Sequence, residues 1–158
     1  MKKYVLVILV IISSKNNLIA HCQVPCGIYN DSHRISEIIE DFKTINKAML
    51  SIKDLSKNSD SLSKNQLNRW IITKENHASN IQRIVSNYFL SQRIKSSNDN
   101  YIEQIIKLQE LLVIAMKCKQ TLDLKLTDDG IDLIHYFSKI YLDYDELQHL
   151  KKNIKKNK

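Results

Sequence analysis

The stretch ISEIIEDFKTINKAMLSI, residues 35–52, decides the fold class of this chain. Seven of its apolar side chains form a stripe at spacings of mostly three and four, which is the period of one face of an α-helix. They are Ile35, Ile38, Ile39, Phe42, Ile45, Met49 and Ile52. Asn30, Asp31 and Ser32 lie just before the stretch, and residues of these types favour a helix N-cap. The pattern therefore predicts an amphipathic helix that begins near residues 30–32.

Three further segments show the same helical period, with polar breaks between them. Their apolar stripes fall, in order, at residues 67–89, 101–122 and 131–147. The polar breaks fall at residues 56–63, 96–100 and 127–130. The chain contains only two glycines and one proline, so few residues interrupt a helix. We expect an all-α fold, an up-and-down four-helix bundle over residues 30–158, without a second domain.

Residues 1–20 are typical of a removable leader. Lys2 and Lys3 precede an apolar run at residues 4–12, which is too short for a permanent span of about 20 residues. We expect a leader peptidase to cut after Ala20, leaving 138 residues (158 minus 20), enough for one domain with its own core.

Other interpretations of the leader stay open. Leu18 occupies a place where a small residue is preferred, so an uncleaved N-terminus that anchors in a membrane is one alternative. Residues 18–20 also resemble a lipobox, but His21 separates them from Cys22, which argues against lipidation. As a signal peptide, the leader predicts export to the periplasm or outside the cell. As a pro-segment, it leaves the protein in the cytoplasm.

The positive charge of the chain is concentrated near its ends. The formal net charge is +7, and removing Lys2, Lys3 and Lys15 with the leader leaves +4. Five of the last eight residues, 151–158, are lysines, which indicates a basic, solvated tail. There is no recognised nucleic-acid motif and no further apolar stretch long enough to cross a bilayer. We therefore expect no nucleic-acid partner and no stable membrane span after cleavage.

The segment HCQVPCGIY, residues 21–29, follows the leader directly, and we call it the hook. If the leader is cut after Ala20, His21 gains a free α-amine. The amine, the next backbone nitrogen and the two thiolates then form a planar N2S2 set, which suits Ni(II) or Cu(II), with the His21 imidazole in an axial position. Such strong donors make a one-electron Ni(II)/Ni(III) cycle plausible. Pro25 and Gly27 suit the turn that this geometry needs.

The cysteines allow a different state. In an exported protein, Cys22 and Cys26 are candidates for a disulfide, which would block metal binding by their sulfurs. Cys118 lies on an apolar helix face, so we expect a buried structural thiol there.

The pattern His21-Cys22-x-x-Pro25-Cys26-Gly27-x-Tyr29 resembles the nickel hook of the nickel-containing superoxide dismutases. Residues 74–78 and 86–89 are similar, more weakly, to blocks of the same family. The resemblance implies a homohexamer of four-helix bundles with one nickel ion per subunit. It also implies an antioxidant enzyme that converts superoxide to dioxygen and hydrogen peroxide.

The resemblance assigns roles to individual residues. The implied ligands are the His21 amine and imidazole, the Cys22 amide nitrogen and sulfur, and the Cys26 sulfur. Tyr29 and Tyr88 match two tyrosines that line the approach to the metal and hold solvent there. Tyr88 also lies on an apolar helix face, where a simple core role is the alternative. Pro25 and Gly27 match residues that fix the turn of the hook.

Two positions depart from the family pattern. Gln23 replaces an acidic residue of the hook, and His77 stands where an arginine supports the axial imidazole. We expect His77 to take over this role, together with Glu37 or, one turn later, Glu40.

Two other functions remain open from the sequence. One is an exported helical metal-binding or metal-delivery protein without turnover. The other is a secreted structural or signalling bundle with a Cys22–Cys26 disulfide.

Overall fold

The structure is a computed structural model that describes residues 29–156. This part of the chain contains helices and no strand, which confirms the all-α prediction. Its elements are α2 (Asp31–Leu55), α3 (Ser61–Arg83), the π-helix η1 (Ile84–Arg93), α4 (Tyr101–Gln120), α5 (Lys125–Tyr141) and α6 (Tyr144–Lys156). None of the helices within residues 29–156 combines the length and the apolar character needed to cross a membrane.

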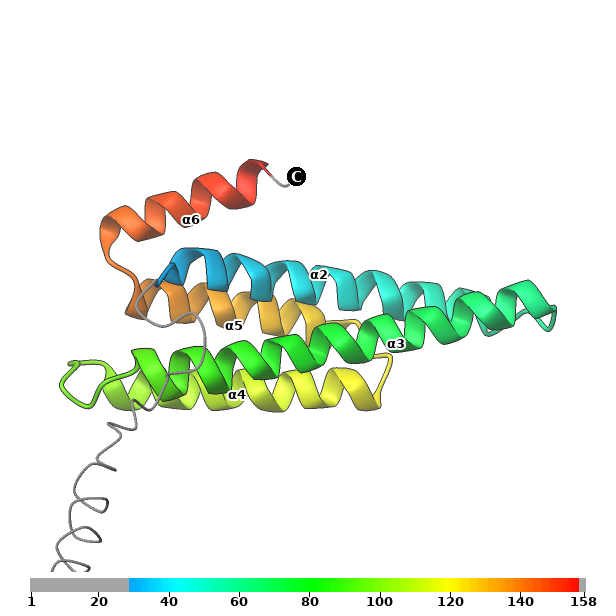
Figure 1. Cartoon of the computed structure of the whole chain (residues 1–158), viewed down its shortest axis with the longest axis horizontal. Coiled ribbons are helices and arrows are strands. Elements are labelled where there is room, and N and C mark those ends of the chain that lie inside the picture. The colour runs from blue at the N-terminus through cyan, green and yellow to red at the C-terminus, as the bar shows by residue number, and fades with distance from the viewer. Residues whose placement is uncertain (1–28, 157–158) are drawn as a thin grey trace, which may run out of the picture.

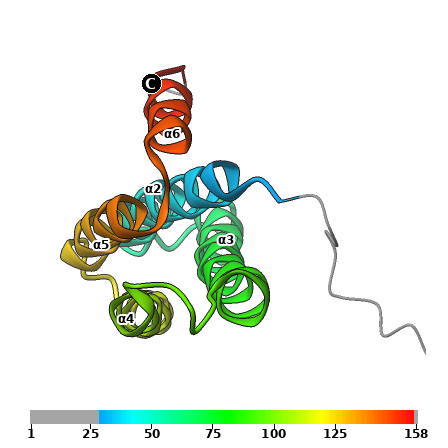
Figure 2. The ribbon, with the colours of Figure 1, turned by 90° about the vertical axis from the view of Figure 1, so that its left-hand side faces the viewer.

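Four of the helices form the predicted bundle. α2 packs against α3 and α5, and α4 packs against α3 and α5, so the four helices close a ring. Viewed end-on, they occupy the corners of a square, and α6 lies outside it beside α2 (Figure 2). Figure 1 shows that the hairpin of α2 and α3 extends beyond the ends of α4 and α5.

The core lies where all four helices overlap. The seven residues of the apolar stripe in the stretch 35–52 are all buried, as their spacing predicts, whereas Leu50, off the stripe, is exposed. Phe42, Phe89 and Phe137 are the largest fully buried side chains. Burying an aliphatic or phenylalanine side chain stabilises a fold by roughly 1.5–3 kcal/mol. Ile71, within the apolar stripe expected at residues 67–89, is instead exposed; Lys74 binds the last carbonyls of α4, so the part of α3 before Lys74 extends past α4.

Three helices begin with a side-chain cap. Asn30 Oδ1 accepts a hydrogen bond of 3.0 Å from the His33 amide, which confirms the predicted start of the first helix. Asp60 caps α3 through the Ser63 amide at 2.9 Å, and Asp143 accepts from the Glu146 amide at the start of α6 at 2.8 Å. Such caps satisfy amides that have no partner inside the helix.

The break predicted at residues 127–130 was wrong. The chain turns at residues 121–124, and Gly130 lies inside α5. Thr127 donates to the Leu124 carbonyl at 2.6 Å and accepts from Asn46 Nδ2 at 2.7 Å, so it ties α5 to α2. A Cβ atom at residue 130 would lie 2.4 Å from the Phe42 ring. The glycine is therefore explained by close packing inside a helix and not by a helix end.

The last predicted helix, residues 131–147, is two helices in the structure. Leu142 is extended, with φ −82° and ψ 147°, and it ends α5. α6 then folds back against α2, where Leu150 is buried. Tyr144, which the helical period placed on the apolar face, is 75% exposed because the two helices do not share one face.

Lys74 closes the C-terminal end of α4. Its ammonium group is buried and donates to the Cys118 carbonyl at 2.9 Å and to the Lys119 carbonyl. A cation is favourable here because the last carbonyls of a helix lack partners and carry partial negative charge. Cys118 is free and buried, as predicted. Burial, opposed by the charge of Lys74, raises the pKa of Cys118 to about 11, so it remains a thiol at neutral pH.

Replacing Gly130 tests the packing of α5 on α2. We expect Gly130→Ala to lower the free energy of unfolding by about 1–3 kcal/mol, because the new methyl group forces the buried Phe42 ring to move. Urea denaturation measures the change. Asp132→Ala, an exposed site on the same helix, should change stability by less than about 0.5 kcal/mol. A Gly130→Ala protein as stable as the parent would contradict the close contact.

Candidate functional site

The predicted metal ligands His21, Cys22 and Cys26 lie outside the described residues, as do Pro25 and Gly27. Within residues 29–156, no three His, Cys, Asp or Glu side chains lie close enough together to hold a metal ion. The geometry of the bundle can be followed from Tyr29, the last residue of the hook.

The two tyrosines expected at the approach to the metal lie side by side. Their ring centroids are 6.0 Å apart, with the rings at 65° in an edge-to-face arrangement. Tyr29 is 41% exposed and precedes α2, whereas Tyr88 on η1 is 4% exposed. The Asn30 amide donates to the Tyr88 hydroxyl oxygen at 3.1 Å. Residues 59 positions apart in the sequence (88 minus 29) thus meet where the hook joins the bundle.

The carboxylate of Asp31 is hydrogen-bonded to three side chains, one of which is Tyr88 itself. It accepts a hydrogen bond from the Tyr88 hydroxyl and another, of 2.7 Å, from the Tyr141 hydroxyl on α5. Arg93 donates through Nε and Nη2, at 2.9 and 2.6 Å to Oδ2. The Asp31 side chain is 3% exposed. A buried carboxylate is stable only with such partners, and bonds that involve charged groups are the stronger ones.

These contacts keep both phenols protonated. Burial and then the hydrogen bond to Asp31 raise the pKa of Tyr88 well above its usual value. The same two causes raise the pKa of Tyr141. Burial lowers the pKa of Arg93, but the hydrogen bonds and charge of Asp31 more than offset this effect, so the pKa lies above its usual value. The group is therefore one ion pair with two neutral hydroxyl donors at physiological pH.

The π-helix η1 brings Tyr88 and Arg93 to one side. In an α-helix, side chains five residues apart point about 140° away from each other. In a π-helix, hydrogen bonds join residues five apart, so such residues stand nearly above one another. The Ile94 amide accordingly donates to the Phe89 carbonyl at 2.9 Å. Arg93 thereby reaches Asp31 and also covers the Tyr29 ring, with its guanidinium carbon 4.2 Å from the ring centroid.

A cluster of aromatic rings connects the tyrosine pair to the core. Tyr88 contacts Phe89 edge to face, with centroids 5.1 Å apart. Phe89 in turn contacts Phe137 and Tyr141 at 5.3 and 5.5 Å. Edge-to-face pairs are favourable beyond their buried area, so the cluster holds Tyr88 in one place.

His77 pairs with a carboxylate that the sequence analysis did not name. Its Nδ1 lies 2.6 Å from Asp41 Oδ1, and Asn80 donates to Asp41 Oδ2 at 2.8 Å. Burial raises the pKa of Asp41, although the hydrogen bonds from His77 and Asn80 oppose this shift. An ionised Asp41 orients the imidazole with Nδ1 toward α2 and leaves Nε2 for another partner.

The expected partners of His77 lie elsewhere on α2. Glu37 pairs with Arg34 at 2.6 Å and with His33 at 3.7 Å, and Glu40 is exposed. Asp41 follows Asp31 by ten residues on α2, a rise of about 15 Å. His77 and Tyr88 therefore contact α2 at two different positions, Asp41 and Asp31.

Three residues of the site were not identified from the sequence: Asp31, Arg93 and Tyr141. From the sequence, Asp31 is only a candidate helix cap, and Tyr141 is only one of the apolar positions of the stripe at residues 131–147. If the segment is read with the period of an α-helix, Arg93 does not lie on its apolar face. Residues 84–93 do contain an aromatic pair followed by an arginine. These side chains come to one side of the helix only because the segment is wound as a π-helix.

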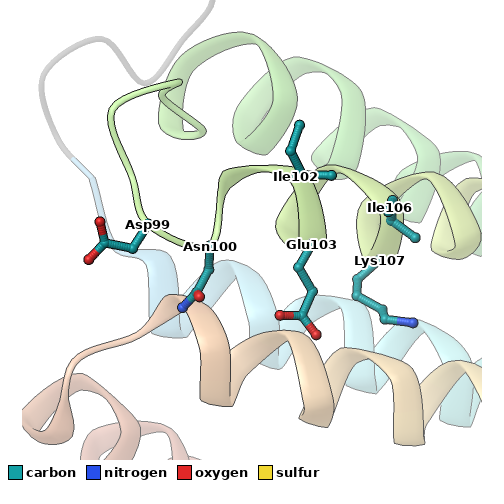
Figure 3. A pocket seen from close by; sticks show the side chains of 6 residues that line it. All are labelled: Asp99, Asn100, Ile102, Glu103, Ile106 and Lys107. Atoms are coloured by element: carbon teal, nitrogen blue, oxygen red, sulfur yellow. The ribbon is translucent and has the colours of Figure 1, made fainter.

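A shallow pocket lies apart from these residues, at the start of α4 (Figure 3). Its lining residues are Asp99, Asn100, Ile102, Glu103, Ile106 and Lys107. Glu103 accepts a hydrogen bond of 2.6 Å from the Tyr136 hydroxyl, which joins α4 to α5. None of the residues predicted for the metal site lines this pocket.

Comparison with known proteins agrees with the sequence pattern. A family model described as nickel-containing superoxide dismutase matches residues 16–145, which include the hook, the tyrosine pair and α2 to α5. No curated protein and no solved structure matches the chain. The matched span is 130 residues (145 minus 16, plus 1) of the 158 in the chain. The chain therefore belongs to the nickel-containing superoxide dismutase family, whose members are nickel-dependent oxidoreductases that act on superoxide.

Proposed function

We propose that this chain disproportionates superoxide to dioxygen and hydrogen peroxide with nickel held by His21, Cys22 and Cys26. The observation that carries the proposal is the Tyr29–Tyr88 pair, which lies where the hook joins the bundle. Cys26 precedes Tyr29 by three residues, so chain connectivity alone keeps their Cα atoms within about 10 Å of each other. A metal bound to Cys26 therefore lies near the pair.

The chemistry of the donor set fits nickel. Nitrogen and thiolate donors in a plane suit Ni(II), and the hook offers an amine, an amide nitrogen and two sulfurs. Bound nickel supplies a one-electron Ni(II)/Ni(III) couple.

The amine exists only after removal of residues 1–20, since the His21 nitrogen is otherwise part of a peptide bond. We propose that a leader peptidase makes this cut. The apolar run at residues 4–12 supports export of the protein.

The two tyrosines take different parts in this proposal. The Tyr88 hydroxyl donates a hydrogen bond to Asp31 and accepts one from the Asn30 amide, so its ring forms a fixed side of the approach. The Tyr29 ring is the more exposed of the two and forms the outer edge of the entrance. A small anion needs a narrow approach with ordered solvent more than it needs a large pocket.

We also propose that His77 would support the His21 imidazole when nickel is bound. Asp41 orients His77 in the way that a carboxylate orients a ligating or supporting histidine. The pair lies about 15 Å along α2 from Asp31. His77 can therefore support His21 only if the metal lies between these two places along α2.

The resemblance to the family supports assembly as a homohexamer. On the bundle surface, Ile102, Ile106 and Met116 of α4 are exposed, and an exposed apolar surface is favourable to cover.

Sedimentation velocity of the mature protein should give a mass near six chains. A monomer at micromolar concentration would contradict this part of the proposal without affecting the metal site.

Adding one residue before His21 tests the ligand role of the terminal amine. In the extended protein the His21 nitrogen is an amide, so we expect at least a ~100-fold loss of superoxide consumption with nickel present, the size of loss that a misplaced catalytic group produces. Stopped-flow decay of superoxide measures the rate. One residue added after Lys158 is the control and should leave the rate unchanged. Full activity of the N-terminally extended protein would refute the proposed ligand set.

Substitution of the cysteines separates the hook from the bundle. Cys22→Ser and Cys26→Ser should remove tight nickel binding and activity, because a hydroxyl replaces a thiolate donor. Cys118→Ala, at the buried thiol, should retain both. His21→Ala keeps the amine and should bind nickel while losing turnover. Metal analysis with the superoxide assay checks these results. A parent protein that binds nickel but leaves superoxide unchanged would favour a metal-delivery protein instead.

A further inference from the structure

We propose that Arg93, fixed by Asp31, is a positioning residue that holds the Tyr29 ring at the entrance of the site. The consequence for turnover rests on the proposed function. The positioning itself is a property of the folded protein without metal.

The contacts of Arg93 leave its guanidinium group little freedom. It donates to both oxygens of Asp31, through Nε at 3.0 and 2.9 Å and through Nη2 at 2.6 Å. Asp31 is in turn held by the hydroxyls of Tyr88 and Tyr141. A planar guanidinium fixed in this way presents one face, and a lysine in its place would lack both the fork and the plane.

The free face of Arg93 covers Tyr29. The guanidinium carbon lies 4.2 Å from the ring centroid, well inside the range of a cation–π contact. Tyr29 precedes α2 and has no helical backbone bonds of its own, so its side-chain contacts decide where the ring lies. Among the described residues, its aromatic and cation–π contacts are with Tyr88 and Arg93. Arg93 thus covers a ring that also contacts Tyr88 in an edge-to-face arrangement.

The π-helical winding of η1 is the reason that Arg93 is in reach. Winding of this kind is rare and is frequently found at functional sites. Here three bonds between residues five apart support it: the Ile94 amide to the Phe89 carbonyl, Ser91 Oγ to the Ser86 carbonyl and Gln92 Nε2 to the Asn87 carbonyl. The winding places Tyr88 and Arg93 on the side of η1 that faces Asp31, next to the proposed entrance.

The test compares Arg93→Ala and Arg93→Lys with Arg83→Ala as the matched control. Arg83 lies ten residues earlier, is exposed, and hydrogen-bonds only to Asn80 among the described residues. The first measurement is NMR of the metal-free mature protein with ¹³C-labelled tyrosine rings. The signal that disappears in Tyr29→Phe is the signal of Tyr29. We expect Arg93→Ala to shift the Tyr29 ring signal and to speed exchange of the Asn30 amide at least tenfold. Arg93→Lys should fold and give intermediate values, and Arg83→Ala should match the parent.

The nickel-loaded proteins give the second readout. At equal nickel content, Arg93→Ala should consume superoxide about tenfold more slowly than the parent, as expected for misplacement of a group at the reacting centre. Unchanged Tyr29 and Asn30 signals in both Arg93 variants would overturn the proposal. A displaced Tyr29 with full activity would overturn the role in turnover. If the parent itself is inactive, the proposed function fails, and the metal-free spectra alone decide whether Arg93 positions Tyr29.

Discussion

The arrangement at the end of the bundle depends on one buried carboxylate. Asp31 is placed at the first turn of α2, where the partial positive charge of the helix N-terminus favours an anion. It joins three elements, because its partners come from η1 and from α5. Leaving such a charge without a partner costs about 3–5 kcal/mol, so the three elements can separate only at a large cost. The point at which the hook enters the bundle is thereby fixed relative to the core.

The backbone of η1 makes this junction possible. π-Helical turns are less common than α-helical ones, so the surrounding structure must favour the unusual winding. Two features do so here. The Phe89 ring is fully buried among Tyr88, Phe137 and Tyr141, and the Asp31 carboxylate binds Tyr88 and Arg93 together. Returning this segment to α-helical winding would turn one of the two side chains away from Asp31.

The sequence predicts local features of this protein well and long-range features less well. The stripe of residues 35–52 is buried because its period is a property of one helix. The proposed ligands of the hook can be named from the sequence because they are neighbours along the chain. Gly130 was misread because glycine usually marks a helix end, whereas here the Phe42 ring occupies the space of its side chain. Asp41 was missed as the partner of His77 because pairing depends on the register of α2 against α3, which no single helix reveals.

The charges around the entrance limit what electrostatics contributes there. Arg93 is neutralised by Asp31, and Arg34, whose guanidinium carbon lies 5.5 Å from the Tyr88 ring centroid, is neutralised by Glu37. Paired charges produce only a weak field beyond a Debye length of about 8–10 Å. Neither arginine therefore acts as a free cation that draws superoxide toward Tyr29. Each instead lies against an aromatic ring, so in the proposed function the bundle contributes the shape of the approach and the hook contributes the chemistry.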